Sequence, residues 1–229
     1  PCLAKQIDRQ FDKYAVTLVN IDGVAFEPFS KLLCFANDPQ KQTIKATIIT
    51  DDDRCSDKSD ESLYISKELD FDCSEAELSD VVTKLTNGTS CDRCNKIVEL
   101  CTAAHINIFT APKTLEYALS FCETNIPYIL GAIIDVYPRL GKTLFEKVEQ
   151  MNEIDKKAAC IWLFMRERSQ QKAAVAQALT RRISDSSIVI NNSGDNLEDF
   201  VTEISFKLPE YLEKAIYTVT EERSDVDAD

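Results

Sequence analysis

The chain has 229 residues, of which 44% are hydrophobic and 28% are charged, as in an ordinary globular protein. Its formal net charge of −13 at pH 7 argues against a broad basic nucleic-acid surface, so any DNA contact is expected to be local or to depend on a metal ion. No apolar run approaches the roughly 18 residues that cross a bilayer, and there is no signal-peptide pattern, so we expect a soluble, cytoplasmic protein with no membrane partner.

The first part of the chain has the pattern of a parallel α/β unit. Residues 15–21 (AVTLVNI) are rich in β-branched side chains and predict a strand that a turn closes. Residues 26–38 have apolar side chains at helical spacing, and residues 43–50 predict a second strand that is buried on both faces. Strand, helix and strand in this order indicate a parallel βαβ unit, whose ligand edge lies at the carboxyl ends of the strands.

The remaining chain is predicted to be mostly helical. An acidic, serine-rich insertion at about 54–90 contains one helix at 74–88, and a helix at 91–104 followed by a strand at 106–111 completes a further parallel step. Later helices are expected at 114–124, 126–137, 140–151, 155–168, 170–183 and 197–222. We therefore predict an α/β core at 1–125, a helical C-terminal region at 126–221 and a disordered tail at 222–229.

The cysteines are interpreted mainly as reduced thiols, because they are odd in number and several fall in helical or apolar segments. A zinc site remains the alternative, since Cys91, Cys94, Cys101 and His105 form a C-x2-C-x6-C-x3-H series. These four residues lie in one predicted helix, and one helix rarely surrounds a tetrahedral ion. The nine cysteines are Cys2, Cys34, Cys55, Cys73, Cys91, Cys94, Cys101, Cys122 and Cys160.

Three aspartates follow the predicted strand at 43–50. Alternation along a strand places Asp51 and Asp53 on one side and Asp52 on the other. Two carboxylates about 7 Å apart can share a hard cation such as Mg²⁺ or Mn²⁺. A solvated acidic turn is the alternative, because clusters of charge are often simply hydrated.

Four segments in chain order give this sequence a resemblance to a known family. The segments are VTLVNIDGVAFEPFSKLL, IKATIITDDDR, NIFTAPKTLEYALS and QQKAAVAQAL. Over about residues 1–182 they resemble the Toprim nuclease domain of the OLD (overcoming lysogenization defect) family, which joins an ABC-type ATPase to a nuclease and includes bacterial anti-phage defence proteins. The resemblance implies an α/β, Toprim-like (Rossmann-like) parallel sheet flanked by helices and followed by a helical C-terminal region.

The resemblance also implies a DNA endonuclease with a two-metal site for Mg²⁺ or Mn²⁺. Asp51 and Asp53 match the family's D-x-D metal ligands, and Thr114 and Glu116 match its T-L-E, which helps to hold a second metal. Lys172 matches the family's catalytic lysine, which stabilises charge on the phosphate, and Glu116 shares the catalytic role.

Each of these later residues also has an ordinary structural interpretation. Thr114 fits a helix N-cap, Glu116 fits an acid in the first turn of a helix, and Lys172 fits a solvated surface lysine. The basic residues at 165–172 and at Arg181–Arg182 either touch a DNA backbone or cover a helix end.

The sequence departs from the family at its beginning. The family has a glutamate in a V-E-G-x-x-E-like stretch that these 229 residues do not contain, and the chain starts at Pro1 within what resembles the following helix. We therefore expect a fragment of a longer protein, with the glutamate and an ATP-binding ATPase domain upstream; the GKT at 141–143 lacks the framing of a phosphate-binding loop. The expected partners are DNA, that ATPase domain, further copies of the chain and a defence-system protein. The alternative is a catalytically incomplete Toprim-like scaffold for assembly, sensing or partner binding.

Overall fold

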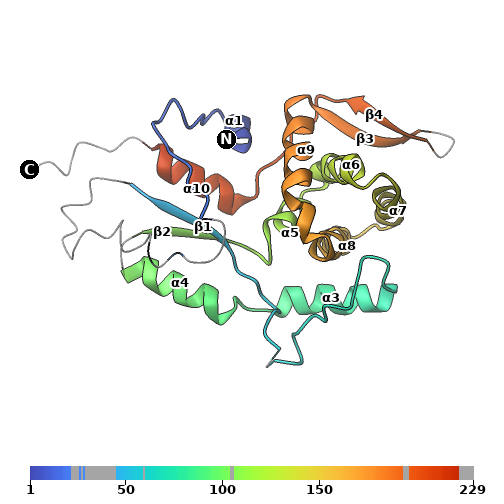
Figure 1. The fold of residues 1–229 in the computed structure, drawn as a ribbon, viewed down its shortest axis with the longest axis horizontal. Coiled ribbons are helices and arrows are strands. Elements are labelled where there is room, and N and C mark those ends of the chain that lie inside the picture. Colours follow the sequence, from blue (N-terminus) through green and yellow to red (C-terminus); the bar gives the residue numbers. More distant parts are fainter. Residues whose placement is uncertain are drawn as a thin grey trace, which may run out of the picture.

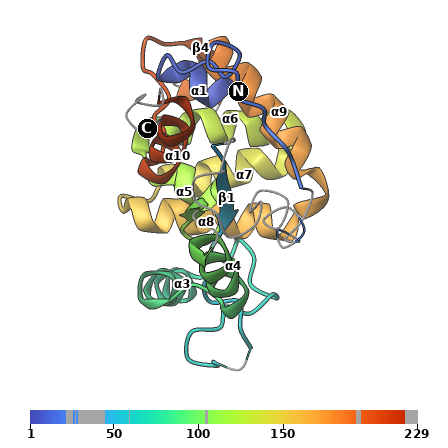
Figure 2. The ribbon, with the colours of Figure 1, turned by 90° about the vertical axis from the view of Figure 1, so that its left-hand side faces the viewer.

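The computed structural model describes residues 1–21, 26, 28, 45–58, 60–103, 106–192 and 196–221. Over these residues the chain is mixed α/β and mostly helical, with a two-stranded parallel sheet and a separate antiparallel hairpin. Figures 1 and 2 show the parallel sheet between helix α10 on one side and helix α4 on the other, next to a group of packed helices. The predicted α/β class is confirmed at this level.

The parallel sheet is formed by β1 (Thr47–Asp51) and β2 (Asn107–Ala111), which run in register from Thr47 opposite Asn107 to Asp51 opposite Ala111. Both strands and their parallel direction agree with the sequence prediction. The prediction that β1 is buried on both faces is wrong. Ile48 and Ile49 point to opposite faces, and Ile48 is 6% exposed whereas Ile49 is 41% exposed. The sheet thus has one well-covered face at this point.

The strand predicted at 15–21 is wrong. Residues 16–21 have no regular secondary structure, and Leu18 and Val19 are each 62% exposed. Ala15 has a φ of 52°, so the chain turns just before this segment. β-branched residues favour a strand only when a neighbouring strand completes their hydrogen bonds, and the described residues supply none here. The helix predicted at 26–38 lies almost entirely outside the described residues.

The connection between β1 and β2 contains α3 (Glu75–Asn87) and α4 (Asp92–Ala103), close to the bounds predicted from the sequence. Helix α3 begins at a capping box, in which the Ser74 hydroxyl accepts from the Glu77 backbone N–H and the Glu77 carboxylate accepts from the Ser74 backbone N–H. It ends at Gly88, as expected. Its buried side chains, which include Leu78 and Leu85, pack toward α8 rather than against the sheet.

The helical part is built around α8 (Ile154–Glu167), in which every residue from 158 to 165 is buried. Trp162 is 2% exposed, which confirms its interpretation as a core residue. The other elements of this part are α5 (Leu115–Ser120), η2 (Glu123–Asn125), α6 (Ile126–Val136), α7 (Pro138–Glu149), η3 (Ser169–Gln171) and α9 (Lys172–Ser184). The helices predicted between 114 and 183 are therefore confirmed.

The C-terminal part differs from the prediction of one long helix at 197–222. Strands β3 (Ser187–Asn192) and β4 (Asn196–Val201) form an antiparallel hairpin, and only α10 (Glu210–Thr220) is helical. The β-branched run at 188–190 favours β3, which in turn supplies the partner that holds β4 extended. The predicted disordered tail at 222–229 lies outside the described residues.

Helix α10 returns to the sheet and packs against both parallel strands, while the short α1 (Cys2–Gln6) lies near α9. The sheet has its own small apolar cluster, consisting of Phe26, Ile48, Ile97, Cys101 and Ile106. The predicted boundary between an α/β core and a helical region at residue 125 stays a prediction. Helix α10, which follows that boundary in the sequence, nevertheless packs on the sheet. Among the described residues, no helix is both long and apolar enough to span a bilayer.

Candidate metal and phosphate site

The candidate site lies at the carboxyl end of the parallel pair. Asp51 is the last residue of β1. The next two residues also form backbone hydrogen bonds, one to the last residue of β2 and one to the segment that follows it. The Asp52 N–H donates to the Ala111 carbonyl at 2.9 Å, and the Asp53 N–H donates to the Lys113 carbonyl at 3.3 Å. The segment that follows β1 is therefore tied to the segment that leads from β2 into α5.

Asp52 holds these two segments together. It is 2% exposed, and its Oδ1 accepts from the backbone N–H of Arg54 at 3.0 Å and of Lys113 at 2.7 Å. The Arg54 guanidinium donates to the Asp52 Oδ2 from Nε at 2.9 Å and from Nη2 at 2.6 Å. A buried carboxylate with this many donors is fully paired, so Asp52 has a structural role.

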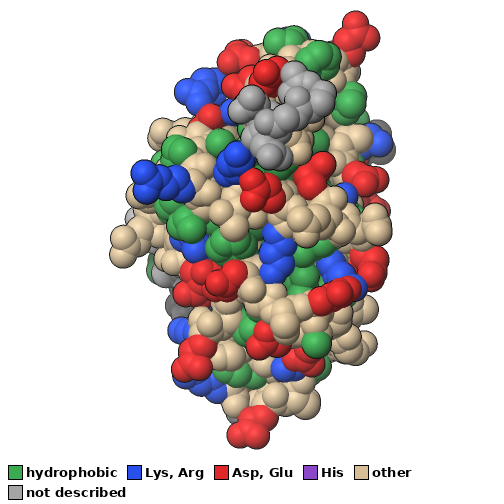
Figure 3. All heavy atoms as spheres, turned by 90° about the vertical axis from the view of Figure 1, so that its right-hand side faces the viewer, with side chains coloured by type: hydrophobic (Ala, Val, Ile, Leu, Met, Phe, Trp, Pro, Cys, Tyr) green, Lys and Arg blue, Asp and Glu red, His purple; other side chains and the backbone are tan. Residues whose placement is uncertain are grey.

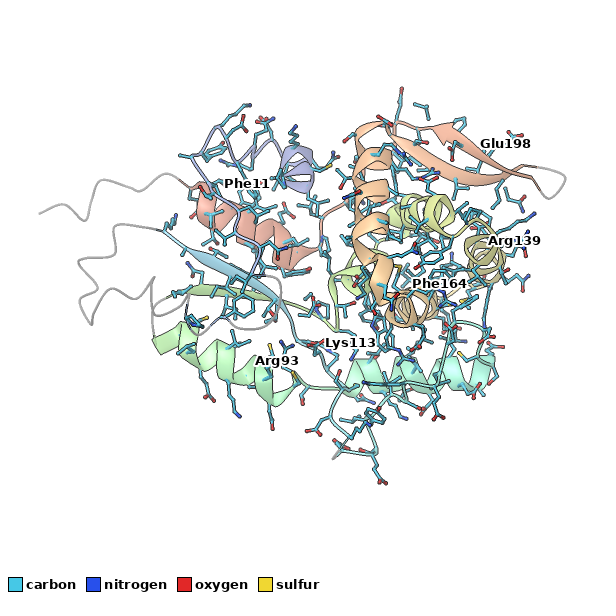
Figure 4. The ribbon with its side chains drawn as sticks, viewed as in Figure 1. Phe11, Arg93, Lys113, Arg139, Phe164 and Glu198 are labelled. Carbon is cyan, nitrogen blue, oxygen red and sulfur yellow. The ribbon has the colours of Figure 1, made fainter. Side chains whose placement is uncertain are left out.

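Lys113 extends the same network. Its Nζ donates to the Arg54 carbonyl at 2.6 Å and to the Ser56 hydroxyl at 2.7 Å, and lies 5.1 Å from the centre of the Trp162 ring. Burial lowers the pKa of this lysine. Figure 4 labels Lys113 between β2 and α5. Sequence reasoning missed Arg54 and Lys113 as structural residues, although Lys113 directly precedes the T-L-E motif.

Asp51 is the acid of this edge that the structure neutralises least. Burial raises its pKa to about 6, and the nearby carboxylates of Glu116 and Asp53 add to the rise, while Lys172 and the backbone N–H of Leu115 oppose it. The charged groups of Asp53, Glu116 and Lys172 are therefore near enough to Asp51 to influence its titration. The structure thus brings together side chains that the sequence places on β1, on α5 and on α9.

Glu116 and Lys172 form an ion pair across this neighbourhood. The Lys172 Nζ lies 3.1 Å from the Glu116 Oε1, and the two side chains are 35% and 24% exposed. Lys172 is the first residue of α9, and Glu116 lies in the first turn of α5. Thr114 is the N-cap of α5, where its hydroxyl accepts from the Tyr117 N–H, so its ordinary structural interpretation holds and its metal-binding role stays a prediction.

Asp53 departs from the predicted alternation. The strand ends at Asp51, and Asp53 has a φ of 48°, which lies in the left-handed region. Its carboxylate pairs with the guanidinium of Arg93 from α4, which Figure 4 labels near the start of that helix. Asp53 still acts electrostatically on Asp51, but it is already partly neutralised.

The described acidic residues fit a site for one hard cation better than a preformed site for two metal ions. Mg²⁺ and Mn²⁺ are often held by one or two carboxylates with water completing the shell, and Asp51 and Glu116 offer such a pair. Burial and, after it, the neighbouring carboxylates raise the pKa of Asp51, and a bound cation would offset both effects. Within the described part of the chain, however, no three or more Asp, Glu, His or Cys side chains lie close enough together to hold a metal ion. The two-metal site therefore stays a prediction.

Tyr211 on α10 was missed by sequence reasoning. Its hydroxyl is buried and has no hydrogen-bond partner among the residues that the structure describes. Burial, together with the neighbouring Asp51 and Glu116, raises the pKa of this phenol well above its usual value. No motif marked it, because α10 is far from the other site residues in the sequence and meets them only through its packing on the sheet.

The cysteine series does not form a zinc site among the described residues. Cys94 and Cys101 lie in α4 and are fully buried, and burial raises the pKa of the Cys94 thiol. His105 lies outside the described residues. The eight cysteines that the structure describes are all free thiols, as expected.

The basic residues that were considered for DNA contact are largely engaged within the protein. Arg182 is 5% exposed and pairs with Asp135 and Asp199, each at 2.8 Å, and Arg181 pairs with Asp135 at 2.9 Å. Arg168 pairs with Asp70 at 3.0 Å. These arginines connect elements of the fold, which supports their structural interpretation.

Comparison of the chain with protein-family models, with curated proteins and with solved structures finds no match. The resemblance described above therefore rests on the four sequence segments alone.

Replacement of Asp52 by alanine is expected to destabilise the protein. The change removes the acceptor for Arg54 and for the Lys113 N–H, at a cost of about 2–4 kcal/mol in the free energy of unfolding. Asp80→Ala is the matched control, because Asp80 is 57% exposed and forms only a surface pair with Lys84, which predicts a change within about 0.5 kcal/mol. Denaturant unfolding measures both, and equal small effects would contradict the structural role of Asp52.

Replacement of Asp51 by asparagine is expected to stabilise the metal-free protein at neutral pH. Because the folded-state pKa of Asp51 is raised from 3.8 to about 6, the folded state binds a proton more tightly than the unfolded state. The contribution of the Asp51 carboxyl group to the free energy of unfolding is fully present below about pH 4, where the group is protonated, and is lost as the pH rises through about 6. The gain of Asp51→Asn should thus reach up to about 3 kcal/mol at pH 7.5 and fade by pH 4.

Urea unfolding in the presence of a chelator measures this difference at each pH. The gain is expected to shrink in a Glu116→Gln background, because one of the carboxylates that raise the pKa of Asp51 is then absent. A destabilised Asp51→Asn protein at pH 7.5 would show that the charged form of Asp51 is not disfavoured in the folded state.

Proposed function

We propose that this chain is the nuclease part of an OLD-like ATPase–nuclease and hydrolyses phosphodiester bonds in DNA with Mg²⁺ or Mn²⁺. The observation that carries the proposal is the meeting of Asp51, Glu116 and Lys172, which come from three separate elements and match three family motifs. A solvated acidic turn after β1 would not require an acid from α5 and a lysine from α9 beside it. The edge at which they meet is where parallel sheets bind ligands.

The side chains divide the work in a way that suits phosphoryl transfer. Asp51 and Glu116 would hold the metal, with Asp53 available once its pair with Arg93 opens. A bound divalent ion supplies Lewis-acid polarisation of the phosphate and lowers the pKa of its water. The Lys172 ammonium, which pairs with Glu116, would balance the charge that collects on the non-bridging oxygens of the phosphate.

The net charge of this chain favours a local DNA contact at the candidate site. The face in Figure 3 carries acidic and basic side chains in alternation, with no continuous basic area over its described residues. Together with the net charge of −13, this arrangement opposes binding of a duplex along that face. The ATPase domain, self-association and a defence-system partner would supply further contacts, and they remain predictions of the family resemblance.

A non-cleaving scaffold is the second candidate function, and one observation favours it. The acids Asp53 and Glu116 are already paired with Arg93 and Lys172. An acidic edge that is neutralised by the protein's own cations needs no metal to fold. The two candidates differ in whether a divalent ion displaces these pairs and DNA is cut.

Nicking of supercoiled plasmid by the full-length protein separates them. The nuclease proposal predicts Mg²⁺- or Mn²⁺-dependent nicking that falls by about 100-fold or more in Asp51→Ala and in Lys172→Ala, because each removes charge stabilisation at the reacting phosphate. Lys214→Ala is the matched lysine control, since Lys214 lies on the exposed surface of α10 and its ion pair among the described residues is with Glu210. Its activity should equal that of the wild type.

Two results would contradict the nuclease proposal. Equal nicking by all four proteins would indicate a contaminating enzyme or another site. Folded wild-type protein that does not nick with either metal would favour the scaffold.

A further inference from the structure

The Tyr211 hydroxyl is a hydrogen-bond donor that has no acceptor within the described part of the chain. It belongs to α10, which packs against both β1 and β2. The hydroxyl oxygen is buried, and no group among the described residues accepts its proton or donates to it. Such an unpaired buried hydroxyl is unfavourable, and native proteins seldom keep one without a partner of some kind.

The surroundings of this hydroxyl indicate what kind of partner is missing. The charged groups that act on it are the carboxylates of Asp51 and Glu116, which are the two acids assigned above to the metal. A tyrosine phenol is ordinarily neutral at physiological pH, so this hydroxyl is a neutral donor. It therefore offers a proton to an acceptor beside the acids and adds no negative charge to them.

A phosphate of a bound DNA strand satisfies these conditions better than an ordinary protein group. Its non-bridging oxygens are strong acceptors, and Asp51 and Glu116 would hold a divalent ion that attracts a phosphate to this edge. Helix α10 reaches the site from one side of the sheet, and Lys172 reaches it from the start of α9. The phosphate would then be contacted by a neutral donor and by a cation from different elements.

We propose that Tyr211 is a substrate-binding residue of the nuclease site, whose hydroxyl donates a hydrogen bond to a non-bridging phosphate oxygen of the bound DNA. This inference rests on the proposed function and adds to it a residue that belongs to none of the motifs carrying the family resemblance.

The test compares Tyr211→Phe with wild type in two measurements. The full-length protein is assayed for plasmid nicking with Mn²⁺, and its thermal unfolding is followed without metal or DNA. Tyr217→Phe is the matched control, because Tyr217 lies on the same helix and its ring contacts Arg9 instead of the acids. Asp51→Ala serves as the reference for loss of the site.

The expected result is a loss of at least about tenfold in kcat/KM for Tyr211→Phe, as for removal of a hydrogen bond to a charged group. Its unfolding midpoint should be unchanged or higher than that of wild type, because the variant no longer buries an unpaired hydroxyl. Tyr217→Phe should retain wild-type activity.

The other outcomes overturn the inference in distinguishable ways. Full activity of Tyr211→Phe beside an inactive Asp51→Ala would refute the role of Tyr211 and leave the proposed function standing. A lowered or lost unfolding transition in Tyr211→Phe would show that the hydroxyl has a structural partner. Absence of metal-dependent nicking by wild type would remove the proposed function and this inference with it.

Discussion

The arrangement of the site depends on one buried carboxylate. The Asp52 carboxylate accepts hydrogen bonds from the backbone N–H of Lys113 and from the guanidinium of Arg54. In this way it joins the end of β1 to the turn that begins α5. The strand pair itself is only five residues long on each side, so the backbone pairing alone fixes little beyond its ends. With the turn held, Thr114 caps α5 and its first turn presents Glu116 toward Asp51.

The three consecutive aspartates raise the question of how like charges can be crowded at the end of a strand. The structure gives each one a different solution. Asp52 is neutralised by Arg54 in the interior, and Asp53 turns away through a left-handed backbone conformation and pairs with Arg93. Asp51 stays without such a cation among the described residues, and burial, with Glu116 and Asp53 adding to it, raises its pKa. Strongly shifted pKa values are more common at functional sites than elsewhere. Asp51 is therefore the candidate metal ligand, whereas Asp52, which is fully paired, has a structural role.

Local patterns in the sequence were sufficient for the elements whose stability is largely local. The helical pattern at 74–88 with its terminal glycine, the apolar spacing of α6 to α9 and the apolar run at 43–50 each predicted the element that forms. The patterns failed where the outcome depends on a distant partner. Residues 15–21 have strand-forming side chains but no neighbouring strand among the described residues, and β4 is extended because β3 lies beside it. A hydrophobic pattern contains no information about which partner will be present.

The same reasoning applies to the candidate site. The D-x-D, T-L-E and lysine motifs identified Asp51, Glu116 and Lys172, and the structure brings these residues together. Arg54, Lys113 and Tyr211 belong to no such motif, because their roles follow from burial and from the packing of α10 on the sheet.

The central claim is that Asp51 and Glu116, which lie on different elements, share one divalent cation. Fe²⁺ occupies oxygen-ligand sites of Mg²⁺ and Mn²⁺, and with ascorbate and peroxide it cuts the polypeptide near where it is bound. The account predicts two groups of backbone cuts, around residue 51 and around residue 116, that Mg²⁺ suppresses and that disappear in Asp51→Ala. Cuts confined to one of these segments, or a pattern unchanged by Asp51→Ala, would contradict it.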